Sequence, residues 1–242
     1  MDLLIDIGNT SLKWATSQSG SLSELQTVQH FGGLPIDLHA AWDQLAVPGR
    51  VLVSNVGGDS MAATVERACR SYWDHSPEFA QTKQSAYGVT VAYECPERLG
   101  VDRWLALVAA HQACAGPALI VDAGTATTYD LLLGDGRHLG GLILPGIQMM
   151  RDSLLAGTHI PRVEPEELDE PWATDTGTAV AAGSIQAPAA LAERLYDRLA
   201  ERSAAAPKLI VTGGDAERLL LAVNRGARHH PDLVLQGLAL IA

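Results

Sequence analysis

The sequence predicts an α/β protein built from two similar halves, and three observations carry this prediction. Short apolar runs typical of buried strands alternate with segments of helical spacing along the chain. The apolar run 3–7 and its later counterpart are each followed by Asp-x-Gly and a second strand. Asp6 and Asp122 hold the same place in the two copies, which are displaced by 116 residues (122 − 6 = 116). A displacement of nearly half of the 242 residues predicts two domains, 1–116 and 117–242.

In the first half, glycine-containing turns separate the apolar runs. The chain resumes as a strand after the first turn, so it opens with a hairpin. Gly57 and Gly58 end a further buried strand, and Asp59 is placed to cap the next helix. The predicted elements are strands 3–7, 12–16 and 50–56 and helices 59–72 and 102–114.

The second half repeats the strand–turn–strand opening and adds a long helix. Thr174 or Asp175 is placed to cap this helix, which runs to Arg202, and Pro188 predicts a kink or a break inside it. An acidic, proline-containing loop is expected at 161–171. The other predicted elements are strands 118–121, 129–133, 138–144 and 208–212 and helices 147–156, 215–223 and 232–241.

The composition is that of a globular, acidic protein. Apolar residues make up 47% and charged residues 19% of the chain, and 28 acidic against 17 basic residues give a net charge of -11. No basic run stands out, which disfavours nucleic acid as a partner, because binding to its backbone relies on Lys and Arg. An acidic enzyme can still bind ATP where backbone amides and Mg²⁺ meet the phosphates.

Several other classes of function are disfavoured. The three cysteines lack the spacing of a disulfide framework or a zinc site and are expected to be packing residues. The eight histidines show no metal-binding spacing, and a P-loop motif is absent from the sequence. The acidic start of the chain lacks a basic n-region, and no apolar run reaches the roughly 18 residues that span a bilayer. We therefore expect a cytoplasmic protein without a membrane partner.

The two Asp-x-Gly turns are candidate phosphate-binding sites. Glycine lets backbone amides approach phosphate oxygens, and a carboxylate such as that of Asp6 can hold Mg²⁺. Lys13, in the strand after the first turn, can reach a phosphate as a point charge. The alternative is that Asp6 and Asp122 only stabilise tight turns by local hydrogen bonds. Two such turns in equivalent positions favour a triphosphate held from both sides.

A second candidate group lies at the start of the predicted helix 102–114. Asp102 can act as the general base that removes a proton from a substrate hydroxyl, or it can be an ordinary helix cap. Arg103 can bind a phosphoryl group or a carboxylate, or it can be a surface ion-pair partner. Gly213 and Gly214 follow an apolar strand and can pack against adenine or ribose, or they can form a plain strand–helix turn.

Together these segments resemble the type III pantothenate kinases, members of the sugar kinase, heat-shock chaperone and actin ATPase superfamily. Six motifs occur in the order of that family. They are Asp6-Ile7-Gly8-Asn9-Thr10 with Lys13, Gly100-Val101-Asp102-Arg103-Trp104 preceded by Tyr93, Asp122 to Thr128, Gly140 to Gly146, Thr212 to Ala216, and His230 to Leu238.

The resemblance implies two actin-like (ribonuclease H-like) half-domains with a nucleotide cleft between them. It implies phosphorylation of pantothenate by ATP to 4'-phosphopantothenate, the first step of coenzyme A biosynthesis. Asp102 would be the proton acceptor, Asp122 would hold a monovalent cation (K⁺ or NH₄⁺), and Asp6 would hold Mg²⁺ with ATP. ATP would be bound by Asp6, Gly8, Asn9, Thr10, Lys13, Thr125, Gly213 and Gly214, and pantothenate by Tyr93, Gly100, Val101, Arg103 and Thr176.

The resemblance also implies a homodimer in which each pantothenate site borrows residues from the partner. The apolar, small-residue helix after Thr174 is either such an interface or a fully buried core helix. The run before it departs from the family's Gly-Lys-Asn-Thr form, so Thr176 is our choice for the substrate-side threonine and Thr178 stays an alternative.

Two other functions are compatible with the resemblance. One is a catalytically silent relative that acts as a regulatory or transcription accessory factor, and the other is a sugar or acyl kinase of the same superfamily. Asp6, Asp102 and Asp122 are all present, whereas a silent relative could lose them. The Gly-x-Asp-Arg run with its upstream tyrosine favours pantothenate over a sugar through the resemblance alone.

Overall fold

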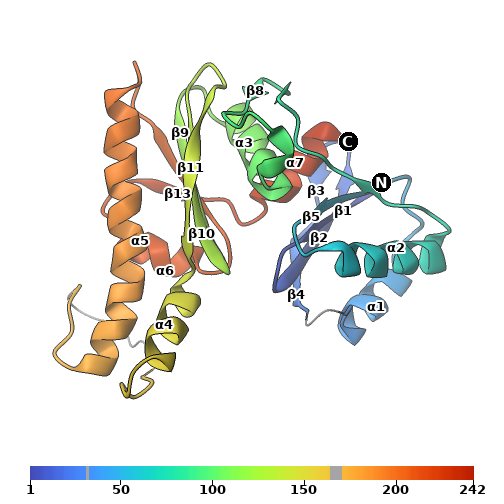
Figure 1. Cartoon of the computed structure of the whole chain (residues 1–242). Helices are drawn as coiled ribbons and strands as arrows, with labels where there is room; N and C mark the ends of the chain where they lie inside the picture. The colour runs from blue at the N-terminus through green and yellow to red at the C-terminus, as the bar shows by residue number, and fades with distance from the viewer. Residues whose placement is uncertain (31–32, 164–170) are drawn as a thin grey trace. The chain divides into compact units, whose positions relative to one another are not determined.

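The computed structural model describes residues 1–30, 33–163 and 171–242, which form two compact units (Figure 1). Unit 1 comprises Met1–Gln112 together with Asp232–Ala242, and unit 2 comprises Ala113–Pro231. Each unit contains one main mixed sheet, and the two sheets repeat the same strand order.

The sheet of unit 1 is built around β1 (Asp2–Ile7). This strand pairs antiparallel with β2 (Ser11–Gln18) and parallel with β5 (Val51–Asn55). The sheet order is β3-β2-β1-β5-β6, with β4 also on β2. The short strands of this unit are β3 (Ser21–Leu22), β4 (Gln26–Gln29), β6 (Glu78–Phe79), β7 (Ser85–Ala86) and β8 (Val89–Thr90), of which β7 and β8 form a separate hairpin.

Helices cover both faces of this sheet because the side chains of β1 alternate between two apolar layers. Leu3, Ile5 and Ile7 pack in one core with α1 (Ile36–Asp43) and α2 (Asp59–Trp73). Leu4 lies on the other face and is also buried, where α7 (Leu233–Ile241) contacts β1, β2 and β5. The unit also contains the 3₁₀ helix η1 (Pro96–Arg98) and α3 (Val101–Ala113). The sequence analysis missed α1.

The last helix differs from the predicted division of the chain. We assigned 117–242 to the second half, whereas α7 returns to the sheet of unit 1. Its mostly apolar sequence provides the cover for the second face of that sheet, which the first 112 residues leave incomplete. Gly237 brings α7 against α3, because a Cβ at this position would overlap the backbone of Leu105. The first unit is therefore formed by two separate stretches of sequence.

Unit 2 repeats the arrangement around β9 (Ala118–Ala123). This strand pairs antiparallel with β10 (Ala126–Leu132) and parallel with β12 (Lys208–Thr212), in the sheet order β11-β10-β9-β12-β13. Residues of α5 (Thr176–Glu201) and α6 (Ala216–Ala222) join β9, β10 and β12 in one core. The other elements are β11 (His138–Pro145), β13 (Ala227–His229), α4 (Ile147–Ala156), α5 (Thr176–Glu201) and α6 (Ala216–Ala222).

Helix α5 corrects one prediction and confirms another. Asp175 is its N-cap, since its side chain accepts the N–H of Thr178 at 2.9 Å. We predicted a kink or a break at Pro188, and the break is wrong, because α5 is one helix from Thr176 to Glu201. Pro188 is buried in the core and its carbonyl accepts the Tyr129 hydroxyl at 2.9 Å, so packing holds the helix where the proline removes one backbone bond. Residues 164–170 of the predicted acidic loop lie outside the described residues.

The cysteines behave as packing residues within unit 1 and unit 2. All three are free; Cys69 and Cys114 are buried, and Cys95 is partly exposed. Burial raises the pKa of the Cys69 thiol to about 12, so this group stays protonated near neutral pH. Among the described residues, no helix has the length and apolar character needed to span a membrane.

The contact between α7 and α3 gives a first testable prediction. Gly237→Ala should destabilise unit 1 by about 1–3 kcal/mol, because the added methyl meets backbone that no rotamer change can move aside. This loss should exceed the gain of about 1 kcal/mol in helix propensity. Urea unfolding can be followed by tryptophan fluorescence, since four of the five tryptophans, Trp14, Trp42, Trp73 and Trp104, are buried in unit 1.

Leu240→Ala is the matched control, because Leu240 lies on the same helix and is exposed. Its unfolding midpoint should stay close to that of the unmodified chain. An unchanged midpoint for Gly237→Ala would show that α7 can move away from α3 without loss.

Candidate active site

The turn between β1 and β2 carries the first group of predicted site residues. Gly8, Asn9 and Thr10 form it, and the Gly8 N–H donates to the Ser11 carbonyl at 2.9 Å. Asp6 is half-buried near the end of β1, and Lys13 is its direct neighbour on β2. Because directly opposed residues share a face of the sheet, the carboxylate and the ammonium lie on the same side.

The turn after β5 packs closely against this first turn. The Val56 N–H donates to the Ile7 carbonyl at 2.9 Å, and a Cβ on Gly57 would lie only 2.7 Å from the Gly8 carbonyl oxygen. Only glycine fits here without displacing the backbone of the first turn. The Asn55 side chain accepts the Gly57 N–H at 3.0 Å and so holds the segment in a tight turn.

Asp102 lies at the start of α3, one residue inside the helix. Its Oδ1 accepts the Arg103 N–H at 2.7 Å, one of the donors that the first helical turn leaves without a backbone acceptor. The same oxygen lies 2.5 Å from where a Cβ on Gly100 would be. The glycine two residues before the aspartate therefore provides the space that the carboxylate occupies, which explains the Gly-x-Asp spacing.

The structure brings four predicted substrate residues of unit 1 together at the start of α3. Arg103 is only 7% exposed, and its guanidinium donates to the Tyr93 hydroxyl at 3.3 Å. A Cβ on Gly100 would also lie 3.8 Å from a methyl of Val56, the residue next to Gly57. The turn 55–58 thus contacts both the first Asp-x-Gly turn and the start of α3. Val101, also predicted, is half-buried in the same helical turn.

The second Asp-x-Gly turn, in unit 2, is one residue shorter than the first. Here the Gly124 N–H donates to the Ala126 carbonyl at 3.0 Å, and only Gly124 and Thr125 separate β9 from β10. A Cβ on Gly146 would overlap the carbonyl oxygens of Gly124 and Thr125, so the start of α4 packs directly on this turn. Thr125 is exposed.

Of the two predicted glycines after β12, Gly213 packs against the end of β9, beside the same turn. Gly213 has φ +97°, and a Cβ there would lie 2.5 Å from Asp122 Oδ1. The Asp215 N–H donates to the Ala123 carbonyl at 2.8 Å, which fixes the turn after β12 on the end of β9. Gly214 lies beside Gly213, is exposed and has no neighbour within 4 Å of its Cβ position.

The neighbours of the two aspartates differ in charge. Asp6 is flanked in register by Lys13 on β2 and by Ser54 on β5. Asp122 is flanked by two threonines, Thr128 on β10 and Thr212 on β12. The first site therefore pairs a carboxylate with a cation, and the second surrounds a carboxylate with hydroxyl groups. The described residues contain no group of three or more His, Cys, Asp or Glu side chains that could hold a metal ion.

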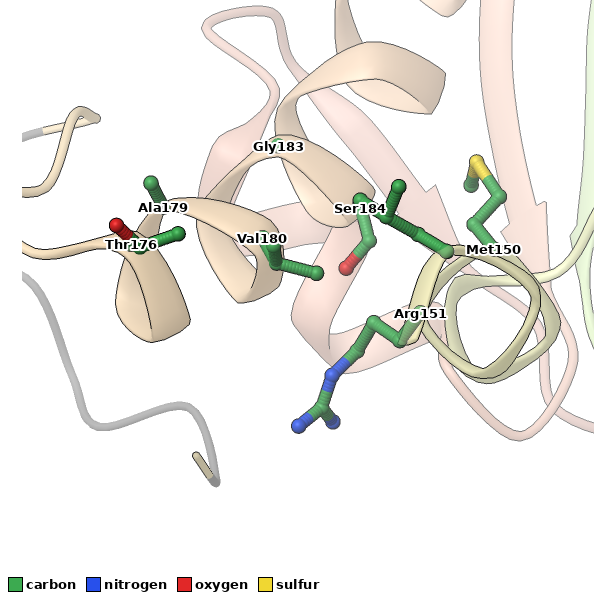
Figure 2. Close-up of a pocket in the computed structure, with 8 residues that line it drawn as sticks. Met150, Arg151, Thr176, Ala179, Val180, Gly183 and Ser184 are labelled. Atoms are coloured by element: carbon green, nitrogen blue, oxygen red, sulfur yellow. The ribbon is translucent and has the colours of Figure 1, made fainter. Parts of the chain in front are cut away.

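The two candidate threonines on α5 have different surroundings. Thr176 is exposed and lines a cavity of about 360 Å³ between α4 and α5. Figure 2 shows Thr176, Ala179, Val180 and Gly183 along α5 beside this cavity, with Met150 and Arg151 on α4. Thr178 hydrogen-bonds the Asp175 carboxyl through its side chain and its N–H, which lowers the pKa of that carboxyl.

Sequence analysis missed residues that shape the first turn. The ring of His30 is 2.9 Å from the Gly8 carbonyl oxygen, and its backbone N–H donates to the Thr10 carbonyl at 3.0 Å. Val56 and Gly57 contact the site, although the sequence analysis used Gly57 only to end a strand. The one available signal was the glycine pair after a strand, because long-range contacts leave no local pattern.

Solved structures of other proteins share this fold. One described as a conserved Baf family transcriptional activator from Campylobacter jejuni has a TM-score of 0.60 at 24% identity, over 99% of this chain and 96% of the other. The activator of the 2-hydroxyisocaproyl-CoA dehydratase from Clostridium difficile, with bound ADPNP, has a TM-score of 0.55 at 13% identity, over 100% and 93%. With the two repeated sheets, these likenesses confirm an α/β fold of actin-like half-domains.

Sequence comparisons identify the family. The family model described as type III pantothenate kinase matches residues 2–198. A type III pantothenate kinase from Nitrosococcus oceani is 39% identical over 249 residues, covering 100% of this chain and 94% of the relative. One from Burkholderia mallei is 38% identical over 263 residues, covering 100% and 99%. The chain belongs to the type III pantothenate kinase family.

Proposed function

We propose that this protein transfers the γ-phosphoryl group of ATP to the hydroxyl of pantothenate, the first step of coenzyme A biosynthesis. The observation that carries the proposal is the arrangement at the start of α3. There Asp102 and Arg103 follow Gly100, which lies against Val56. Val56 belongs to the turn 55–58, which also packs against the candidate phosphate turn. A base and an anion-binding group are thereby held next to a phosphate-binding backbone within one unit.

Asp102 accepts the proton of the attacking hydroxyl. As the new bond forms between that oxygen and the γ-phosphorus, the bond from the γ-phosphorus to the bridging oxygen of ADP breaks, and ADP leaves with the electron pair. Arg103 binds an anionic group of the substrates, and its hydrogen bond to Tyr93 holds the guanidinium in place. Gly100 and Val101 line the pantothenate pocket.

The first turn binds the phosphates of ATP. Backbone groups of Gly8, Asn9 and Thr10 meet phosphate oxygens, and Lys13 adds a positive charge beside them. The oxygen ligand of Asp6 suits Mg²⁺, which offsets the negative charge of the phosphates when bound with ATP. In unit 2, Thr125, Gly213 and Gly214 contact the nucleotide.

Asp122 holds a monovalent cation, potassium or ammonium. Support comes from its register neighbours, because the carboxylate lies between Thr128 and Thr212, whose hydroxyl groups offer further oxygen atoms. A cation there would reduce the repulsion between Asp122 and the ATP phosphates.

The protein acts as a homodimer through α5. One face of α5 is buried in unit 2. Elsewhere the helix exposes small residues, which are Ala179, Gly183, Ala187 and Ala190. Exposed apolar side chains lie nearby. Leu154, which lines the cavity, is 46% exposed, and Trp172, which precedes α5 in the sequence, is 66% exposed. Thr176, which lines the cavity, contributes to the pantothenate site of the partner.

An ADP-release assay tests the function as a whole. Purified protein with Mg²⁺, potassium and ATP should release ADP when pantothenate is added, and a panel of sugars and carboxylic acids should give much lower rates. A rate above background with a sugar alone would favour the sugar-kinase alternative. No ADP release with any acceptor would favour a catalytically silent relative.

The role of Asp102 gives the second testable prediction. Asp102→Asn should lower kcat by roughly 10²–10⁴-fold, because the amide cannot accept the hydroxyl proton. Binding of a non-hydrolysable ATP analogue, measured by calorimetry, should be preserved. Glu97→Gln is the control, since it makes the same change at an exposed acid in η1. Near-normal turnover by Asp102→Asn would show that Asp102 is not the proton acceptor.

The cation site gives the third prediction. Activity should be low in sodium or Tris buffer and rise with potassium or ammonium, and Asp122→Asn should abolish this response. Asp135→Asn, at an exposed turn of the same sheet, should keep it. Equal rates in all four buffers would assign Asp122 another task, such as holding Mg²⁺.

The interface gives the fourth prediction. Light scattering should report about twice the chain mass of 25.6 kDa. Gly183→Arg should give monomers, because its Cβ position has no neighbour within 4 Å and the bulky group would protrude toward a partner without disturbing the fold. Leu221→Arg, at an 86% exposed site on α6, should remain dimeric.

Subunit mixing tests whether the partner completes the site. Asp102→Asn and Thr176→Arg chains should each be inactive alone, and mixing them should restore part of the activity, since one site of the hybrid dimer is intact. A fully active monomer would contradict the proposed assembly.

A further inference from the structure

The Gly8 carbonyl is held from two sides within unit 1. The ring of His30 lies 2.9 Å from its oxygen, and Gly57 leaves the space that this oxygen fills on another side. The backbone of His30 also bonds the turn, through its N–H to the Thr10 carbonyl at 3.0 Å. Two of the carbonyls of the turn are therefore directed toward one residue.

The hydrogen-bond acceptor, the Gly8 carbonyl, identifies which ring nitrogen of His30 carries a hydrogen. A carbonyl oxygen can only accept, so Nε2 of His30 is the donor and carries hydrogen. His30 is 5% exposed, and Nδ1 is buried without a hydrogen-bond partner among the described residues. The only hydrogen bond of the ring within the described chain is thus the one to Gly8. A ring buried for this single contact indicates that the contact matters to the turn.

This contact determines where a neighbouring N–H points. The Gly8 carbonyl and the Asn9 N–H belong to the same peptide unit, which is planar and trans. In such a unit the C=O and N–H bonds point in opposite directions. With its carbonyl held on His30, the peptide unit directs the Asn9 N–H away from the His30 ring. Asn9 itself is exposed at the tip of the turn, where a phosphate oxygen can approach.

We propose that His30 is a positioning residue for ATP: its ring N–H orients the Gly8–Asn9 peptide unit so that the Asn9 N–H is presented to a phosphate oxygen. This inference rests on the proposed role of residues 6–13 in ATP binding. His30 acts through the backbone of the turn and does not itself take part in phosphoryl transfer.

The test compares three substitutions that differ in the hydrogen-bond donor they offer to Gly8. His30→Ala removes it, His30→Asn is too short to reach Gly8, and His30→Gln places an amide N–H near the position of Nε2. The KM for ATP should rise about 3- to 10-fold in His30→Ala and His30→Asn, as expected for the loss of one hydrogen bond. His30→Gln should stay within about 2-fold of the unmodified enzyme. The KM for pantothenate should be unchanged in all three.

His39→Ala is the matched structural control. His39 also makes one ring hydrogen bond in unit 1, to the Tyr72 hydroxyl at 2.8 Å, but it lies on α1. Its KM for ATP should not change. If His30→Ala proves too unstable to assay, the Asn and Gln variants still decide the question. Equal ATP KM values for those two variants, or an equal loss for both substrates, would overturn the inference.

Lys13→Ala separates this inference from the proposed function. A raised KM for ATP in Lys13→Ala, together with a normal KM for ATP in the His30 variants, would contradict only the inference about His30. An unchanged KM for ATP in Lys13→Ala would instead contradict the proposal that the first turn binds ATP. Calorimetric titration with a non-hydrolysable ATP analogue gives the same comparison without turnover.

Discussion

Both Asp-x-Gly turns depend on a close approach of backbone to backbone at the end of a central strand. In unit 1 Gly57 lies on the Gly8 carbonyl. In unit 2 Gly213 lies on the last two residues of β9, and Gly146 lies on the two residues that follow this strand. Protein interiors are packed so tightly that a methyl group at these points would have to move main chain. The same constraint therefore fixes the shape of both turns and, with it, the place of Asp6 and Asp122 at the ends of β1 and β9.

On this common frame, the cross-strand neighbours decide what each turn can bind. The lysine beside Asp6 brings its own positive charge, so that site suits an anion with a bound divalent ion. The register neighbours of Asp122 are two threonines, which offer hydroxyl dipoles in place of the charge that Lys13 brings to Asp6. The turn after Asp122 is also one residue shorter than the turn after Asp6. Two similar backbone turns thus have different electrostatic environments because their neighbouring residues differ.

The sequence predicted the features that arise from local patterns. The repeat, the central hairpins and the helix that starts beside Asp102 follow from short apolar runs and glycine spacing, and the structure contains them. The grouping of Tyr93 and Val101 with Asp102 was expected only from the resemblance to the family. It could not predict that α7 joins unit 1, that α5 passes Pro188 unbroken, or that His30 contacts Gly8, because each depends on residues far away in the chain. Thr176 and Thr178 share one helical turn, so only the phase of the folded helix distinguishes them.

The return of α7 to unit 1 has a consequence for the order in which the protein can fold during synthesis. Residues 113–231 are continuous, so unit 2 can become compact once they have left the ribosome. Most of unit 1 is synthesised first, but its core cannot be completed at that stage. The sheet face that carries Leu4 lacks its cover until residues 232–242 emerge. A nascent chain with an uncovered apolar sheet face is prone to aggregation. The unit that is synthesised first is therefore the later one to complete its core.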